Sequence, residues 1–164
     1  MPSHGRGFPD NRSMPASLVL TWEALDELVA RLARSCGRDF DLVLAITRGG
    51  LVPAGMLAYR LDLREILVAG AVFYLPEGGT HERPVIGLFP ADELLVGRRV
   101  LVVDEVWETG ETMTEILARV RAAGATPTSA VLHYKPGRSR VPGAPDHYAA
   151  TVEGWVTYPY KAGG

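Results

Sequence analysis

Residues 100–112 read Val-Leu-Val-Val-Asp-Glu-Val-Trp-Glu-Thr-Gly-Glu-Thr, and this stretch determines the fold class. The continuous apolar run over 100–103 predicts a buried strand that ends at two acids, Asp104 and Glu105. A turn of small residues follows, and a helical pattern begins at Glu111. A buried strand that leads through a short turn into a helix is typical of the parallel sheet of an α/β domain.

The turn over residues 108–112, called here the 108–112 turn, is suited to a phosphorylated and hydroxylated ligand. Backbone N–H groups at the start of a helix favour a phosphate. The carboxylates of Asp104 and Glu105 can accept hydrogen bonds from hydroxyl groups or hold a metal ion. The chain has no Gly-x-x-x-x-Gly-Lys-Ser/Thr and no Gly-x-Gly-x-x-Gly after a strand, so a P-loop nucleotidase is excluded and a dinucleotide fold is disfavoured.

The acids around this turn are too many for an ordinary helix start. A helix dipole accounts for Glu111, and an i, i+4 pair with Arg119 accounts for Glu115. Neither effect accounts for Asp104 and Glu105, which follow a buried strand directly. Like charges this close raise each other's pKa unless a cation or hydroxyl donors relieve them. We therefore interpret this pair, with Glu108, as functional.

The rest of the chain alternates between strand and helix. The patterns predict helices over 22–35, 52–61 and 111–123, and strands over 40–46, 66–74, 99–103 and 127–134. This alternation predicts an α/β domain with a largely parallel central sheet flanked by helices. Ligands bind at the carboxyl ends of such strands, so residues 47–50 and 104–112 are expected to face one ligand.

Residues 47–50, Thr-Arg-Gly-Gly, are called here the 47–50 loop. Gly49 and Gly50 allow the backbone to approach an anion and to adopt positive φ. Arg48 supplies a permanent fork of donors for phosphate oxygens. On its own, the loop is equally compatible with an ordinary turn between a strand and a helix.

Size and composition set the outer limits. The 164 residues suggest one domain, expected over 18–164, after a flexible arm over 1–17. The formal net charge of −2 and the absence of a long apolar run give no reason to expect nucleic acid or a membrane as a partner. The single cysteine, Cys36, rules out an internal disulfide and favours a reducing, cytoplasmic setting.

The 100–112 stretch resembles the phosphoribosyl pyrophosphate (PRPP) signature of the type I phosphoribosyltransferases, and the resemblance covers residues 38–160. It implies that Asp104 and Glu105 hold the ribose 2′- and 3′-hydroxyls. It also implies that the 5′-phosphate lies on the backbone N–H groups and threonine hydroxyls of the next turn, at Thr109, Gly110, Glu111 and Thr112. Glu108 stands where the family usually has an aspartate that acts in proton transfer at N7 of a purine, and it is one methylene longer.

Two further segments carry the same resemblance. Residues 45–54 are similar to the family's pyrophosphate loop, most closely in the bacterial xanthine-guanine branch, which implies that Arg48, Gly49 and Gly50 bind pyrophosphate. In the xanthine-guanine and hypoxanthine branches a lysine contacts the purine 6-oxygen, an aromatic residue stacks on the base, and the next residue's carbonyl meets the ring edge. Three residues match that order and spacing: Lys135, Trp155 and Val156.

A lysine can only donate hydrogen bonds, so Lys135 favours a 6-oxopurine over adenine, whose 6-amino group is itself a donor. The resemblance therefore implies transfer of the 5-phosphoribosyl group from PRPP to hypoxanthine, guanine or xanthine in purine salvage. It also implies Mg²⁺, held by Asp104 and Glu105 directly or through water, a small hood mainly from 136–164, a lid over 74–84, and a homodimer or homotetramer. Another acceptor (uracil, orotate or adenine) and a PRPP-sensing regulator that binds RNA or protein without turnover remain the alternatives.

Overall fold

The computed structural model describes residues 17–75, 77–79 and 82–161. The predicted arm over 1–17 therefore lies outside the described residues, except for Ser17. The helices are α1 (Trp22–Cys36), α2 (Leu51–Leu61) and α3 (Glu111–Ala122), with short 3-10 turns η1 (Asp92–Leu94), η2 (Pro136–Arg138) and η3 (Pro159–Lys161). The strands are β1 (Leu18–Val19), β2 (Leu42–Ile46), β3 (Ile66–Tyr74), β4 (Arg83–Leu88), β5 (Arg99–Trp107), β6 (Thr126–Tyr134), β7 (His147–Thr151) and β8 (Val156–Thr157).

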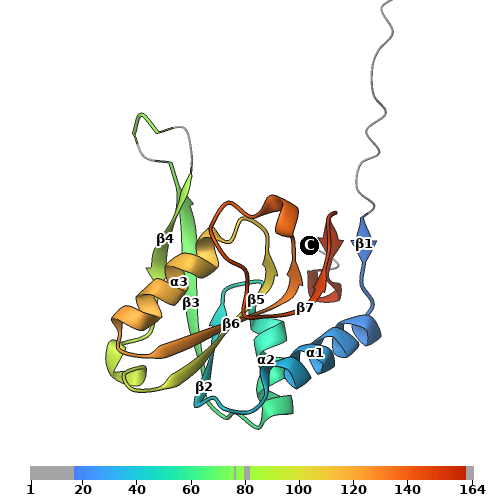
Figure 1. Cartoon of the computed structure of the whole chain (residues 1–164), viewed down its shortest axis with the longest axis horizontal. Helices are drawn as coiled ribbons and strands as arrows, with labels where there is room; N and C mark the ends of the chain where they lie inside the picture. Colours follow the sequence, from blue (N-terminus) through green and yellow to red (C-terminus); the bar gives the residue numbers. More distant parts are fainter. Residues whose placement is uncertain (1–16, 76, 80–81, 162–164) are drawn as a thin grey trace, which may run out of the picture.

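A six-stranded sheet in the order β4-β3-β2-β5-β6-β7 forms the centre of the molecule (Figure 1). The neighbours from β3 to β7 pair in parallel, and only β4 is antiparallel, as the second strand of a hairpin with β3. Helices α1 and α2 pack on one face of the sheet and share one apolar cluster. Helix α3 packs on the other face over a second apolar cluster. The predicted α/β fold with a mostly parallel sheet is confirmed.

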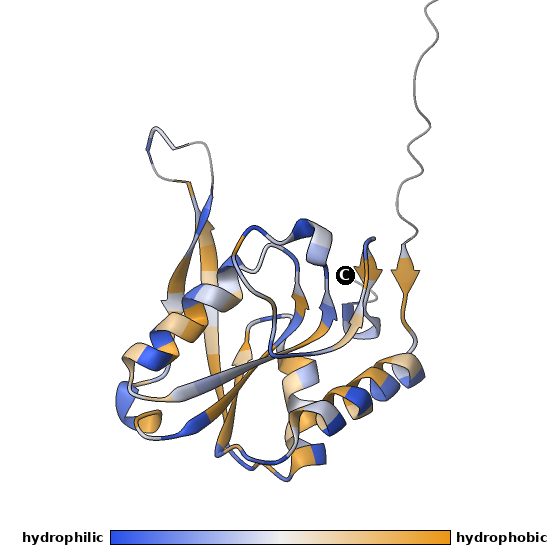
Figure 2. Cartoon of the chain, viewed as in Figure 1, coloured by the Kyte–Doolittle hydropathy of each residue, from blue (hydrophilic) through white to orange (hydrophobic). Residues whose placement is uncertain are grey.

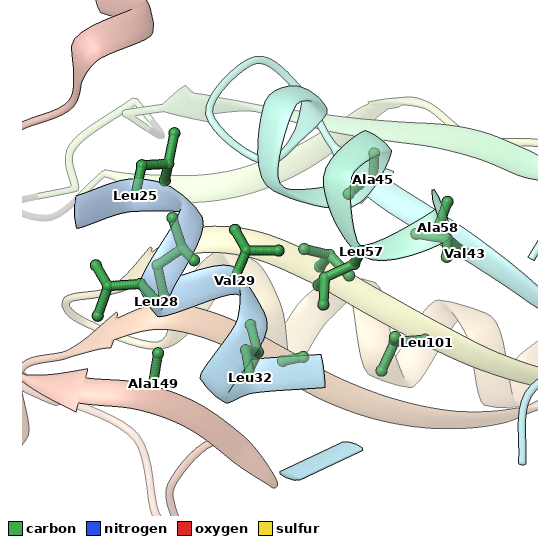
Figure 3. Close-up of a cluster of buried hydrophobic side chains, with 14 of the residues drawn as sticks. Leu25, Leu28, Val29, Leu32, Val43, Ala45, Leu57, Ala58, Leu101 and Ala149 are labelled. Carbon is green, nitrogen blue, oxygen red and sulfur yellow. The ribbon is translucent and has the colours of Figure 1, made fainter. Parts of the chain in front are cut away.

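Helix α1 shows how the sequence pattern builds this core. Thr21 caps its first turn, because the Thr21 hydroxyl accepts a hydrogen bond from the Ala24 N–H at 3.1 Å. The apolar stripe of α1, at Leu25, Leu28, Val29 and Leu32, is buried against Leu57 of α2 and against the sheet (Figure 3).

Strand β5 is longer than the sequence pattern predicts. The expected strand ends at Val103, but pairing with β6 continues until Trp107 lies opposite Tyr134. The two acids therefore lie within the strand rather than after it. Because successive side chains of a strand point to opposite faces, Asp104 and Glu105 point in different directions. This geometry determines what each acid can do.

A second, two-stranded sheet joins the two ends of the described chain. Strands β1 and β8 pair in parallel, with Leu18 opposite Val156, and they lie beside the carboxyl edge of the large sheet (Figure 1). Figure 2 shows that both short strands carry apolar residues. The assignment of residues 136–164 as the main part of a hood stays a prediction. None of the helices described here has the length and apolar character needed to cross a membrane.

Candidate active site

The carboxyl ends of the neighbouring strands β2 and β5 bring the two predicted segments together. A Cβ atom on Gly50 would lie 2.4 Å from the Val103 carbonyl oxygen, and one on Gly49 would lie 2.4 Å from Cδ of Glu105. The 47–50 loop therefore packs directly on β5, and glycine is required for space. Neither glycine has positive φ, so the expectation of positive φ at these positions is wrong. The peptide bond between Thr47 and Arg48 is cis.

The turn after β5 opens into a cavity of about 250 Å³. Asp104 contributes to its wall, together with Val106, Trp107, Glu108, Thr109, Gly110, Thr112, Met113 and Phe73 from β3. Of the residues predicted to bind PRPP, this cavity brings together Asp104, Thr109, Gly110 and Thr112. Glu111 lines a different pocket, together with Glu82, Arg83 and Arg140.

Gly110 shapes the entry to α3. Its φ of 81° is a conformation that favours glycine, and a Cβ atom there would lie 2.4 Å from the Trp107 ring nitrogen. Among the described residues no side chain caps α3 at Gly110, so N–H groups of its first turn are available to an anionic ligand. The Thr109 hydroxyl makes only a long contact, 3.4 Å, with the Glu111 N–H. The 108–112 turn thus has the form expected of a phosphate site.

Of the two adjacent acids of β5, Asp104 is the one that lines this cavity. Its pKa is raised to about 7, and burial is the largest cause. The hydrogen bond from the Glu105 N–H acts to lower the pKa, the neighbouring Glu105 carboxylate acts to raise it, and the charge of Lys161 acts to lower it. A half-buried carboxylate whose pKa lies near neutrality is suited to hydroxyl donors or a cation, either of which would favour its ionised form.

Glu105 points elsewhere. Its carboxylate accepts a hydrogen bond from the Tyr160 hydroxyl at 2.7 Å and forms an ion pair with Lys161, so both of its oxygens already have partners. It does not line the cavity that holds Asp104. The sequence pattern treats the two acids as one pair, and the structure divides them. A role for Glu105 in holding ribose or metal stays a prediction, because each of its oxygens already accepts from one side chain.

Glu108 lies between two cations. Its Oε1 atom is 3.4 Å from Nζ of Lys135 and 3.1 Å from a guanidinium nitrogen of Arg138. Lys135 is only 6% exposed, so it is a buried residue of the site rather than a solvated loop lysine. The structure thus brings the predicted proton-transfer and base-contact residues together. The ion pair of Arg138 with Glu108 was not predicted from the sequence. The position of Arg138, three residues after Lys135 in a predicted loop, could have indicated it.

The other residues predicted to contact ligands are more dispersed. Trp155 is 68% exposed and is not among the residues lining the Asp104 cavity, whereas Val156 is buried in β8. Arg48 is exposed on the 47–50 loop. Tyr160 and Lys161 were not recognised as site residues, because their contacts with Glu105 join positions more than fifty residues apart and have no local pattern.

A parallel sheet whose central strand carries a half-buried acid toward an uncapped helix start is an architecture suited to a phosphorylated ligand. The family model of the phosphoribosyl transferase domain matches residues 18–158 of this sequence. The chain belongs to this family and is a phosphoribosyltransferase, which confirms the resemblance seen in the sequence and the enzyme class that it implied.

Known relatives include enzymes for several purines. A xanthine-guanine phosphoribosyltransferase of Gluconobacter oxydans is 33% identical over 150 residues, covering 87% of this chain and 83% of the relative. An adenine phosphoribosyltransferase of Saccharopolyspora erythraea is 34% identical over 142 residues, covering 79% and 75%. The crystal structure of a purine phosphoribosyltransferase from Pyrococcus horikoshii has a TM-score of 0.76 and 32% identity, covering 90% of this chain and 95% of the other.

Proposed function

We propose that this enzyme transfers the 5-phosphoribosyl group from PRPP to a 6-oxopurine (hypoxanthine, guanine or xanthine), forming a nucleoside 5′-monophosphate and pyrophosphate in purine salvage. The observation that carries the acceptor assignment is the buried Lys135 ammonium, 3.4 Å from the Glu108 carboxylate. The Lys135 ammonium is a hydrogen-bond donor, and the Glu108 carboxylate beside it is an acceptor. A 6-oxopurine meets the donor with its 6-oxygen and the acceptor with the proton at N7.

The donor substrate fits the remaining groups. The 5′-phosphate would lie on the 108–112 turn, where the N–H groups of α3 are uncapped. The ribose hydroxyls would donate to Asp104 in the cavity wall. The pyrophosphate would meet Arg48 and the backbone of Gly49 and Gly50 at the end of β2. Strands β2 and β5 are neighbours, so one PRPP molecule can reach both segments.

The same groups suit the charges that develop in the reaction. As the bond between C1 of ribose and pyrophosphate breaks, positive charge builds on the sugar ring and negative charge on the leaving group. The carboxylate of Asp104 stabilises the ring, and Arg48 stabilises the departing pyrophosphate. Glu108 accepts the N7 proton as the new C–N bond forms, while Lys135 donates to the 6-oxygen.

Mg²⁺ is the implied cofactor, and Asp104 fits it. The pKa of this half-buried acid is raised to about 7, and no cation is bonded directly to it in the part of the chain that the structure describes. Mg²⁺ usually binds through one or two carboxylates together with substrate phosphates and water. Bound there, the ion would neutralise charge on the pyrophosphate. Glu105 fits it poorly, because Tyr160 and Lys161 occupy its oxygens.

Adenine is the nearest competing acceptor, since enzymes for adenine and for xanthine and guanine are both among the relatives. A lysine ammonium has donors only and would face the 6-amino group of adenine, which donates as well. Uracil and orotate lack the imidazole nitrogen that Glu108 would serve. A regulator that binds RNA finds little support, because the net charge is −2 and Arg138 is engaged with Glu108.

A pyrophosphate-release assay tests the proposal. The enzyme is given PRPP, Mg²⁺ and one base at a time from hypoxanthine, guanine, xanthine, adenine, uracil and orotate. We expect turnover with at least one 6-oxopurine and a much lower kcat/KM with adenine. Turnover with adenine or a pyrimidine alone would reject the acceptor assignment. Binding of PRPP without turnover of any base, together with salt-dependent RNA binding, would favour the regulator. Cytoplasmic localisation and a homodimeric or homotetrameric assembly stay predictions.

A further inference from the structure

Residues 158–161, called here the 158–161 segment, contact Glu105 through three polar side chains. The Tyr160 hydroxyl donates to Oε2 of Glu105 at 2.7 Å, and Nζ of Lys161 donates to Oε1. The Tyr158 hydroxyl lies 3.2 Å from the Glu105 backbone oxygen. Glu105 is 8% exposed, so these contacts replace nearly all of its hydration. A buried carboxylate needs such partners, because an unpaired charge in the interior is costly.

The segment itself is held firmly. Tyr158 is buried, and its hydroxyl is 2.8 Å from Nδ1 of His133 on β6. The rings of Tyr158 and Tyr160 stack with centroids 5.5 Å apart and an interplanar angle of 17°. Lys161 Nζ lies 5.6 Å from the centre of the Tyr158 ring. The contacts of buried Tyr158 with His133, Tyr160 and Lys161 therefore fix the positions of the Tyr160 hydroxyl and the Lys161 ammonium.

On its other side, the Glu105 side chain touches the 47–50 loop. Its Cδ, Oε1 and Cγ atoms occupy the space that a side chain on Gly49 would need, at 2.4, 2.6 and 2.8 Å from the ideal Cβ position. The Tyr160 oxygen also lies 3.3 Å from the Gly49 carbonyl oxygen. The carboxylate is thus wedged between the loop and the 158–161 segment. Because these groups are in contact, a movement of the Glu105 side chain would displace the backbone of the 47–50 loop.

We propose that Tyr160 and Lys161 are positioning residues that hold Glu105 against the 47–50 loop and so preset this loop for the pyrophosphate group of PRPP. This inference rests on the proposed function and deepens it, since it gives Glu105 a role different from that of Asp104. Asp104 meets the ligand in the cavity, and Glu105 supports the neighbouring loop from behind. The two acids of one motif then serve the two ends of the same substrate.

The expected effects are specific to one substrate. Tyr160→Phe removes one hydroxyl donor, and Lys161→Met leaves Glu105 without its cation. Loss of a hydrogen bond to a buried charged group weakens binding by about tenfold or more when binding depends on that geometry. We expect each variant to raise KM for PRPP by about tenfold and to weaken binding of magnesium pyrophosphate to a similar extent. KM for the base, which the 47–50 loop does not contact in the proposed arrangement, is expected to stay unchanged.

The experiment measures steady-state kinetics with PRPP and base varied separately, calorimetric titration with magnesium pyrophosphate, and thermal unfolding. Lys161→Arg retains a cation and is expected to restore most of the PRPP affinity. Tyr59→Phe, at a tyrosine that is 91% exposed on α2, and Arg121→Met, on the exposed side of α3, are the matched controls. Both controls are expected to behave like the natural chain.

The outcomes separate this inference from the proposed function. If the natural chain neither turns over nor binds PRPP, the proposed function fails, and the inference fails with it. If the natural chain is active and both Tyr160→Phe and Lys161→Met keep a normal KM for PRPP, only the inference is overturned. It is also overturned if KM rises equally for PRPP and base together with a lower melting temperature, because that result indicates general loss of structure.

Discussion

The Lys135 ammonium lies 3.4 Å from the Glu108 carboxylate, and 7% of the lysine side chain is exposed. Arg138 approaches the same carboxylate oxygen at 3.1 Å from the solvent side, with 63% of its side chain exposed. Glu108 is therefore held by one buried and one exposed cation. This arrangement fixes where the longer glutamate side chain can place its oxygens, and it makes the role of each residue separately testable.

Replacement of Glu108 by glutamine tests proton transfer. Glutamine keeps the size of the side chain but cannot take up the N7 proton. We predict a fall in kcat of about 10²- to 10⁴-fold, the usual contribution of general acid–base catalysis. Glu115→Gln, at an exposed position on α3, serves as the control. Unchanged turnover of Glu108→Gln in stopped-time assays would remove Glu108 from the mechanism.

Lys135→Met tests the choice of base. The variant removes the donor for a 6-oxygen, so we predict that kcat/KM for the preferred 6-oxopurine falls by about 10- to 100-fold. The value for adenine should change much less, and the ratio of the two is the quantity to measure. Arg138→Met removes the exposed cation near the same carboxylate and should change this ratio little. An equal loss for both bases in Lys135→Met would show that Lys135 does not select the base.

His133 makes the stability of the fold depend on pH. Burial is the largest cause that lowers its pKa from 6.5 to about 4, and the charge of Lys135 lowers it as well. Below pH 6.5 the unfolded chain binds a proton that the folded chain does not, so the free energy of unfolding decreases as the pH falls toward 4. The contribution is on the order of 3 kcal/mol.

Urea unfolding at pH 7, 5.5 and 4.5 measures this effect. In His133→Asn the amide can still meet the Tyr158 hydroxyl, but the titrating group is gone. We predict that this variant loses less stability between pH 7 and 4.5 than the natural chain. An equal decrease in the two proteins would mean that other groups cause the acid sensitivity.

Two glycines of neighbouring segments provide a matched test of packing. The Cβ atom of Gly50→Ala would lie 2.4 Å from the Val103 carbonyl oxygen and 2.7 Å from that of Ile46, both backbone atoms that cannot turn away. We predict destabilisation by roughly 1–3 kcal/mol together with weaker PRPP binding. Gly55→Ala in α2 meets no atom within 4 Å and should stabilise the helix by roughly 0.5–1 kcal/mol. Chemical unfolding compares them, and equal stability of the two variants would contradict this packing account.

Much of the fold could be predicted because it depends on local patterns. The helix predicted over 22–35 and the strand predicted over 40–46 are each read from residues close in sequence, and α1 and β2 confirm them. The end of β5 could not be read this way, because its last residues are strand only through pairing with His133 and Tyr134 on β6. The antiparallel direction of β4 was equally undetermined, since a short apolar segment carries no sign of its orientation.

The candidate site divides along the same line. Asp104, Thr109 and Gly110 line one cavity, as the motif predicts. They belong to one strand and the turn that follows it, so their closeness in sequence also makes them close in space. The contact of Lys135 with Glu108 follows from the parallel pairing of β5 with β6. Tyr160 and Lys161 reach Glu105 only because the chain returns across the carboxyl edge of the sheet.

The amino-acid sequence by itself determined the alternation of strands and helices, the phosphate-type turn after β5 and the family, because each is written in neighbouring residues. Only the tertiary structure decided that Asp104 faces the cavity while the Glu105 side chain lies against the 47–50 loop. The physical reason is that strand pairing extends β5 through both acids, and a strand turns consecutive side chains to opposite faces.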